Sequence, residues 1–311
     1  MDFDHAITAI DTGFFRPRFD ASHLIVENGH AAFVDVGTNH SLTRLLAALA
    51  DRQLPVDAVD YVILTHVHLD HAGGAGALMQ QLPRARLVVH PRGARHMIDP
   101  GQLIAGATAV YGAEEIRRSY GDLVPVDAAR VDIADDGHIV NLAGRELLCL
   151  DTPGHARHHI SIVDARSRGI FPGDTFGLSY REFDTVNGAF ILPTTTPVQF
   201  DPESLHASID RMLGFAPQQM FLTHYSRVAS VEKLARDLHK RIDAMVVIAL
   251  EHAGHPDRHA RIVAALSEYF IAQARAHGCR LDDARINELL DMDLELNTQG
   301  LEVWLDRNRC S

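Results

Sequence analysis

Short apolar runs and longer periodic runs alternate along the body of the chain, and each kind predicts one type of element. Residues 59–66, VDYVILTH, form a continuous apolar run that is typical of a strand buried on both faces. Two apolar runs flank Asn28-Gly29, a dipeptide that fits the tight turn of a β-hairpin. Leucines recur at helical spacing in residues 41–54, which predicts a helix with Ser41 as its N-cap.

The same alternation continues as far as residue 227. Residues 91–120 are interrupted by glycines and predict several short helices. Residues 175–202 show no periodicity and carry their own aromatic side chains, and a loop of this length is usually functional or a lid. Helices are further predicted at 73–83 and 204–213, and strands within 85–91, 130–134, 138–143, 145–155, 159–165, 168–174 and 218–224.

The pattern changes after Arg227. Apolar positions now recur at helical spacing, first from Val231 to Met245 and then across residues 257–278. A third helix is predicted over 282–290, and a last amphipathic piece carries Trp304. The chain therefore divides into an α/β body, residues 1–227, and a helical C-terminal extension, residues 228–311.

Composition narrows the classes of function. The chain has 311 residues, 46% of them hydrophobic, and a formal net charge of −12, so nucleic acid and anionic membranes are not expected as partners. Its three cysteines, Cys149, Cys279 and Cys310, are far apart and give no disulfide framework. The first residues are acidic rather than basic and no apolar run is long enough to cross a membrane, so we expect a cytoplasmic protein.

A dense group of polar side chains follows the predicted strand at 59–66. In ILTHVHLDHAGG, His66, His68, Asp70 and His71 lie within six residues, between the strand and a helix. The end of a strand is where ligands often bind in α/β proteins, and His66 and His68 point to the same side if the backbone is extended. Capping by Asp70 explains one of these residues but not the burial of four polar groups without a partner. The cluster therefore predicts a metal site with nitrogen and oxygen ligands.

THVHLDHAGG resembles the H-x-H-x-D-H signature of the metallo-β-lactamase superfamily. Four other segments resemble further motifs of that family and occur in the family's order. One precedes the cluster, FVDVG with Asp35, and three follow it: LDTPGHARHHIS with His155, GIFPGDT with Asp174 and MFLTHYS with His224. The resemblance covers about residues 5–227 and leaves the helical extension unassigned. It implies an αββα four-layer sandwich, to which the chain adds a helical C-terminal extension.

The resemblance also implies two divalent metal ions. Five histidines and two carboxylates form a ligand set typical of zinc, with iron or manganese as alternatives. Asp35 is then expected to support the site without touching metal. A pair of cations makes a hydroxide nucleophile from water at neutral pH, so no serine or cysteine nucleophile is needed. Carried over residue by residue, the first metal takes His66, His68 and His155, the second takes Asp70, His71 and His224, and Asp174 bridges.

Other residues carry weaker signals. Asp70 and Tyr225 are the catalytic candidates, Tyr225 as a donor to an oxyanion, although a packed tyrosine explains that position equally well. His159 is expected to orient the site, and His158, which replaces a glycine of the family pattern, is expected to be exposed. The remaining histidines, His96 among them, are expected to be solvated. Candidates for the substrate wall are Tyr180, Arg181 and Phe183.

The substrate is left open by the sequence. The main hypothesis is a dinuclear metal hydrolase that cleaves a small ester, lactone or thioester. The alternatives are a phosphodiesterase and a metal-bearing binding or regulatory protein whose hydrolysis is incidental. The extension can cover the active site or form a homodimer, because Met245–Leu250, MVVIAL, is apolar all round and needs burial.

Overall fold

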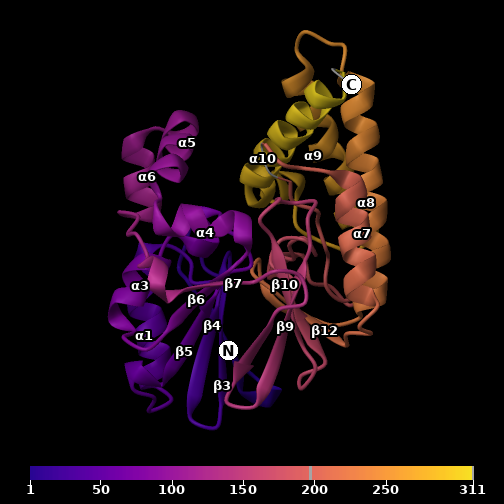
Figure 1. Ribbon diagram of the computed structural model, residues 1–311. Helices are drawn as coiled ribbons and strands as arrows, with labels where there is room; N and C mark the ends of the chain where they lie inside the picture. Colours follow the sequence, from indigo (N-terminus) through magenta and orange to yellow (C-terminus); the bar gives the residue numbers. More distant parts are fainter. Residues whose placement is uncertain (196–197, 310–311) are drawn as a thin grey trace.

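Two β-sheets pack face to face, with helices on both outer faces (Figure 1). The computed structural model describes residues 1–195 and 198–309. Strands β1–β4 of the first sheet are antiparallel and β4–β7 are parallel. From edge to edge this sheet holds β1 (Asp2–Phe3), β2 (Ile7–Asp11), β3 (Ala21–Glu27), β4 (His30–Val34), β5 (Val59–Ile63), β6 (Arg86–Val89) and β7 (Val131–Ile133).

The second sheet has six strands, and all its neighbours are antiparallel except β11 and β12. Its order is β13 (Ser226–Val228), β12 (Gln219–Leu222), β11 (Gly169–Phe171), β10 (Ile160–Asp164), β9 (Arg145–Asp151) and β8 (Ile139–Leu142). The sequence pattern predicted the strands of both sheets except three: the two-residue β1, β2, and β13, which is only three residues long.

Helices surround the sheets in two groups. Near the first sheet lie α1 (Leu42–Ala50), α2 (Leu69–Ala72), α3 (Ala75–Gln81), α4 (Pro91–Ile98), α5 (Gly101–Tyr111) and α6 (Ala113–Tyr120). Near the second lie α7 (Pro202–Leu213), α8 (Val231–His252), α9 (Arg258–Ala276) and α10 (Asp283–Arg309).

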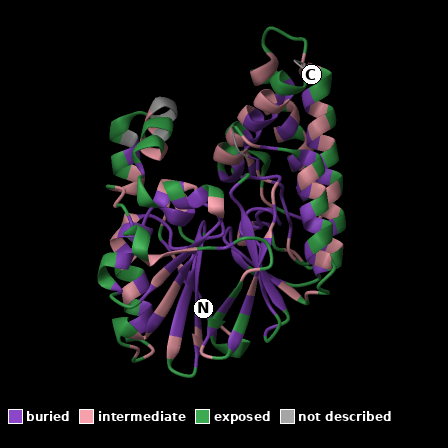
Figure 2. Ribbon diagram, in the orientation of Figure 1, coloured by how far each residue is buried: buried purple, intermediate pink, exposed green. Residues whose placement is uncertain are grey.

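Successive side chains of a strand point to opposite faces of its sheet, so each sheet contributes to two apolar layers. Leu24 and Val62 pack in the cluster between the first sheet and its helices, whereas their neighbours Ile25 and Ile63 pack in the cluster between the sheets. A third cluster lies between the second sheet and its helices. Figure 2 shows the strands largely buried and the outer helix faces exposed. The predicted αββα four-layer sandwich is confirmed.

Two local predictions concern a helix cap and a turn. Ser41 is not a conventional N-cap of α1, because its side chain makes no capping hydrogen bond there. It belongs instead to a capping box of the preceding short helix, where Thr38 N donates to Ser41 Oγ at 3.1 Å. The hairpin at Asn28-Gly29 is confirmed, with Glu27 paired to His30.

The end of the chain forms one helix instead of two. α10 runs without a break from Asp283 to Arg309, through Gly300. A glycine inside a helix costs about 1 kcal/mol relative to alanine. Leu294 on one side of it and Leu301 and Leu305 on the other are all buried in the same cluster, and this burial outweighs the local cost.

The helical extension shares that cluster with the α/β body. Met245 and Ala249 of the MVVIAL segment are buried, whereas Val247 and Leu250 are 52% and 56% exposed. The predicted boundary after Arg227 falls within β13, and α8 begins at Val231. Cys149 and Cys279 are buried and free, and Cys310 lies outside the described residues. Among the described helices, none has the length and apolarity needed to cross a membrane.

Candidate metal centre

The segment after β5 places four of the predicted ligands. β5 ends at Ile63, and the backbone is still extended at His68, with φ −66° and ψ 150°. His66 and His68 therefore point to one side, while Val67 between them packs into the apolar layer below. The short helix α2 then carries Asp70 and His71 to the same place.

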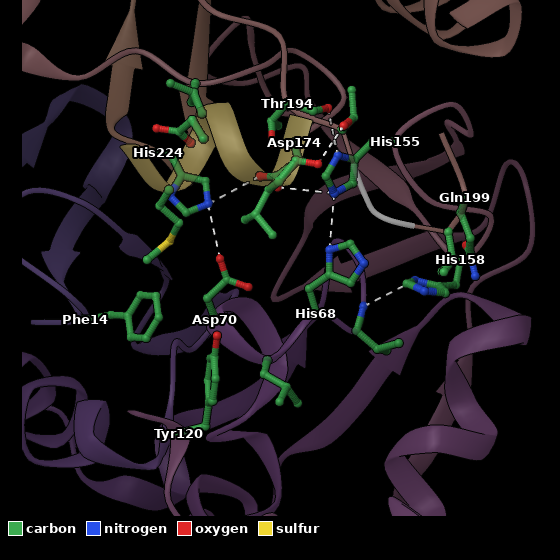
Figure 3. Close-up of a pocket in the computed structure, with 18 of the residues that line it drawn as sticks. Phe14, His68, Asp70, Tyr120, His155, His158, Asp174, Thr194, Gln199 and His224 are labelled. Atoms are coloured by element: carbon green, nitrogen blue, oxygen red, sulfur yellow. Dashed lines mark hydrogen bonds and ion pairs between the residues drawn. The ribbon is translucent and has the colours of Figure 1, made fainter. Parts of the chain in front are cut away.

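His66, His68, His155 and Asp174 form one group of ligand atoms that all lie within 4.8 Å of one another. His68 Nδ1 is 2.7 Å from His66 Nε2 and 3.2 Å from His155 Nε2. Asp174 Oδ2 is 3.3 Å from His155 Nε2 and 4.0 Å from His66 Nε2. Figure 3 shows His68, His155 and Asp174 converging from separate segments.

Asp70, His71 and His224 form a second group directly beside the first. His224 Nε2 and His71 Nε2 lie 3.4 Å and 3.7 Å from Asp70 Oδ2. The other oxygen of Asp174, Oδ1, lies 3.4 Å from His71 Nε2 and 3.7 Å from His224 Nε2. One carboxylate therefore faces both groups, and the structure brings all seven predicted ligands together.

The donor set fits divalent cations. His71 Nε2 and Asp174 Oδ1 are buried and have no hydrogen-bond partner, an arrangement that is costly unless a cation satisfies both atoms. Burial, reinforced by neighbouring histidines, lowers the pKa of His66 and His68 well below the usual value, so both are neutral as metal ligands must be.

The two groups that face each other at the centre carry opposite charge. Burial opposes ionisation of Asp174, but the charges of His71 and His224 outweigh it and hold the pKa of Asp174 well below its usual value. Burial likewise opposes protonation of His71, but Asp174 and Asp70 raise its pKa well above the usual value. A bound cation supplies the positive charge that His71 otherwise carries.

Asp35 supports the cluster from below. Its Oδ2 lies 2.8 Å from His71 Nδ1 and accepts a hydrogen bond from Thr223 Oγ1 at 2.9 Å. Its Oδ1 accepts a hydrogen bond from Thr65 N at 2.8 Å. These contacts join the loop after β4 to the ends of β5 and β12. Asp35 thus takes the supporting position that the D-x-G motif predicted.

Backbone carbonyls orient two further histidines. His155 Nδ1 lies 3.1 Å from Thr194 O, and His224 Nδ1 lies 2.9 Å from Phe19 O. A carbonyl only accepts, so each Nδ1 carries a proton, and this orientation leaves each Nε2 as the atom that can bind a cation at the cluster.

His159 fits the expected orienting role. It is fully buried, and Asp174 N donates to its Nε2 at 3.2 Å. Gly173 allows this approach, because its φ is +49° and a Cβ there would lie 2.5 Å from His159 Nε2. Glycine at position 173 therefore allows the loop that carries Asp174 to pass close to His159.

A cavity of about 360 Å³ opens above the two groups. Leu103 of α5 and Tyr120 of α6 line one side, and Met292 and Asp293 of α10 line another. The segment 175–202 contributes the described residues Leu178, Tyr180, Thr194, Thr195, Val198 and Gln199. The long loop and the helical extension therefore both border the predicted site.

Several predicted residues lie elsewhere. Tyr225 is buried and is not among the described residues that line the cavity, so the packed alternative describes it and nothing supports an oxyanion role. Of the three wall candidates only Tyr180 lines the cavity. Phe183 packs in the core against Phe190, and Arg181 folds back to donate to Ser179 O at 3.1 Å.

His158 and His96 correct two predictions of exposure. His158 is only 8% exposed, because its ring packs against those of His66 and His68. His96 is half-buried and also lines the cavity. The lining residues that were not predicted from the sequence belong to segments with an ordinary local pattern, and they include Phe14, His96, Tyr120 and Asp293.

A family model described as the metallo-beta-lactamase superfamily matches residues 16–224. The chain is 27% identical over 224 residues to the metallo-beta-lactamase fold-containing protein ST1585 of Sulfurisphaera tokodaii, covering 71% of this chain and 77% of that protein. It is also 29% identical over 198 residues to the hydroxyacylglutathione hydrolase of Aeromonas hydrophila, covering 63% of this chain and 58% of that enzyme.

Solved structures of other proteins share this fold. The structure of ST1585 matches with a TM-score of 0.62 at 25% identity, over 78% of this chain and 86% of that one. A metallo-beta-lactamase family protein of Thermus thermophilus, TTHA1429, matches with a TM-score of 0.69 at 19% identity, over 98% of this chain and 94% of that one. The match to the family model spans more than half of the chain and includes both ligand groups, so the chain belongs to the metallo-β-lactamase superfamily.

Proposed function

We propose that this protein is a dinuclear metal-dependent hydrolase of a small ester, lactone or thioester. The observation that carries the proposal is the position of Asp174, whose Oδ2 faces the group of His66, His68 and His155 and whose Oδ1 faces that of Asp70, His71 and His224. Each group has three ligand side chains besides the shared carboxylate, which suits one cation per group.

Zinc is the proposed metal, because five imidazoles and two carboxylates form a donor set that zinc prefers, with iron and manganese as alternatives. Two such cations, when bound, supply a nucleophile from water at neutral pH and stabilise developing negative charge. The chain's own contribution is to hold the ligands through Asp35 and the backbone carbonyls and to shield the site within the cavity.

Water as the nucleophile agrees with the cavity walls. Among the described residues that line the cavity there is no serine, cysteine or lysine. Hydrolysis then adds water to the acyl carbon, breaks its bond to oxygen or sulfur, and releases a carboxylic acid and an alcohol or thiol. Hydrolysis of this type is supported by the hydroxyacylglutathione hydrolases among the relatives, including that of Cronobacter sakazakii at 26% identity.

The test joins metal analysis to a substrate panel. Purified protein should hold about two metal ions per chain and should cleave members of a set of lactones, carboxylic esters and thioesters. Phosphodiesters and sulfate esters belong in the same panel. Cleavage of phosphodiesters alone would replace the proposal with a phosphodiesterase, and two bound metals without turnover would favour a binding or regulatory protein.

A further inference from the structure

The walls of the cavity are apolar on several sides. Phe14 precedes β3, Leu103 comes from α5, Leu178 comes from the long loop, and Met292 and Leu296 come from α10. These side chains belong to four separate segments, so the apolar lining is built by the tertiary fold. An apolar lining of this kind favours a ligand with an apolar chain.

Histidines are the only basic side chains among the described residues of the same walls. None of the described lining residues is a lysine or an arginine. His96 and His158 line the cavity outside the two ligand groups, and they are half-buried and buried, respectively. Arg95 contacts His96 Nε2 at 3.2 Å but is exposed and does not line the cavity.

A half-buried cation, Arg16, lies behind the wall. Its guanidinium stacks over the ring of Tyr180, with Cζ 4.4 Å from the ring centroid, and Nη1 pairs with Glu182 Oε1 at 2.7 Å. The fully buried Tyr180 ring contacts this guanidinium, while the tyrosine hydroxyl bonds to Asp293. Arg16 is not among the described residues that line the cavity, although its Nε and Nη2 are buried and have no hydrogen-bond partner.

Among the described lining residues, Asp293 is the one carboxylate outside the two ligand groups. Tyr180 OH donates to its two oxygens, at 3.0 and 3.2 Å, which holds the carboxylate at the α10 wall. Figure 3 shows the yellow ribbon of α10 beside His224 and Asp174. A second negative group brought against this wall, away from the two ligand groups, meets the negative charge of Asp293.

We infer that the cavity selects an uncharged ester, lactone or thioester with an apolar chain, and that Asp293 is the specificity-determining residue that excludes carboxylate-bearing substrates. Glutathione thioesters, which carry two carboxylates, are among those excluded. The inference rests on the proposed function, which supplies the type of bond that is cleaved. The preference for an uncharged ligand over a carboxylate-bearing one is a property of binding and can be measured without cleavage.

Two thioethers of equal chain length test this preference without any reaction. S-hexylglutathione carries two carboxylates and an ammonium group, whereas S-hexyl-N-acetylcysteamine is uncharged, and neither has a bond that the proposed reaction cleaves. Burial raises the pKa of Asp293 to about 7, with the charges of His224 and Arg16 opposing the shift and Asp174 adding to it. Titration calorimetry on the metal-loaded protein is therefore done at about pH 8, where Asp293 is ionised.

The uncharged thioether should bind at least about tenfold more tightly than S-hexylglutathione. Equal or tighter binding of S-hexylglutathione would overturn the inference. If such binding accompanies ester hydrolysis, only the inference falls. If the uncharged thioether is preferred but no ester is cleaved, the proposed function falls and the binding preference stands.

Variants test the role of Asp293 itself. Asp293→Asn keeps an acceptor for Tyr180 but removes the charge, and it should narrow the ratio of the two affinities by about tenfold. Asp291→Asn, an exposed acid on the same helix, should leave the ratio unchanged. Tyr180→Phe removes the hydrogen bond but keeps the charge and should preserve the preference. Thermal unfolding checks that the Asp293→Asn variant is folded. If the folded variant keeps the wild-type ratio of the two thioether affinities, Asp293 does not determine the preference.

Discussion

Asp35 Oδ2 lies 2.8 Å from His71 Nδ1, and both side chains are buried. This contact directs His71 Nε2 towards Asp174 Oδ1, 3.4 Å away. Asp35 also holds Thr65 and Thr223, so one carboxylate aligns three segments that meet at the cluster. The orientation of a ligand therefore depends on a residue that belongs to neither ligand group.

Replacement of Asp35 by asparagine should weaken metal binding by about 10- to 100-fold, because His71 loses its charged partner. Competition with a chromophoric chelator measures the affinity. The control is Asp60→Asn, which removes a surface carboxylate that lies 2.7 Å from His30 Nδ1 and should have no effect on metal binding. Unchanged affinity in Asp35→Asn would contradict the supporting role.

Asp174→Ala should lose metal and hydrolytic activity together, since the same carboxylate faces both ligand groups. A loss of about 100-fold or more in kcat/KM is expected. Elemental analysis and turnover of the best substrate in the panel measure the two effects. Asp243→Ala, which removes an exposed carboxylate on α8, is the control. Full occupancy and full turnover in Asp174→Ala would rule out the bridging assignment.

Removal of metal should lower the stability of the fold. A ligand present at a hundredfold excess over its Kd stabilises the folded state by about 2.7 kcal/mol. We expect chelated protein to unfold at a lower temperature, and added zinc to restore the original transition. Calorimetric scans at increasing zinc concentration provide the measurement. A melting temperature that is indifferent to zinc, together with no bound zinc, would speak against the site.

His23 should make stability depend on pH. It is buried against Phe171 and Phe221, and burial lowers its pKa to about 3. Below the unfolded-state pKa of about 6.5 the unfolded chain binds a proton that the folded chain excludes. This contribution is therefore fully present above pH 6.5 and is lost by about 1.4 kcal/mol per pH unit as the pH falls towards 3.

His23→Gln removes the titrating group and nearly preserves its size. Urea unfolding of the metal-free wild type and variant, between about pH 7 and pH 4.5, should show that the variant loses less stability with acid. Metal-free protein is used for both because metal binding by histidines depends on pH and would add its own slope to the profiles. Parallel profiles of the two proteins would contradict the assignment.

Arg145 and Asp164 form a buried ion pair, with Arg145 Nη2 2.5 Å from Asp164 Oδ2. Arg145→Met should cost about 3–5 kcal/mol, because it leaves a buried carboxylate without its partner. The control is Arg86→Met, which breaks a more exposed pair with Asp132 and should cost less than about 1 kcal/mol. Urea unfolding measures both. Equal costs in the two variants would show that burial does not control the energy of these pairs.

Local patterns in the sequence predicted most of the fold. Continuous apolar runs predicted buried strands such as β5, and Asn28-Gly29 predicted the hairpin between β3 and β4. Both predictions succeed because strand burial and turn geometry depend on neighbouring residues. The predictions failed at α10, where contacts made by Leu294, Leu301 and Leu305 carry the helix through Gly300.

The sequence by itself determined the ligand types and the four-residue cluster from His66 to His71, because they lie in one short segment whose backbone direction is local. The remaining ligands were identified by resemblance, and only the tertiary structure placed them around one point. Tertiary structure alone also buried His158 and brought Asp293 to Tyr180, 113 residues away along the chain. Such contacts depend on how layers and helices pack, and no local periodicity encodes a distance between segments so far apart.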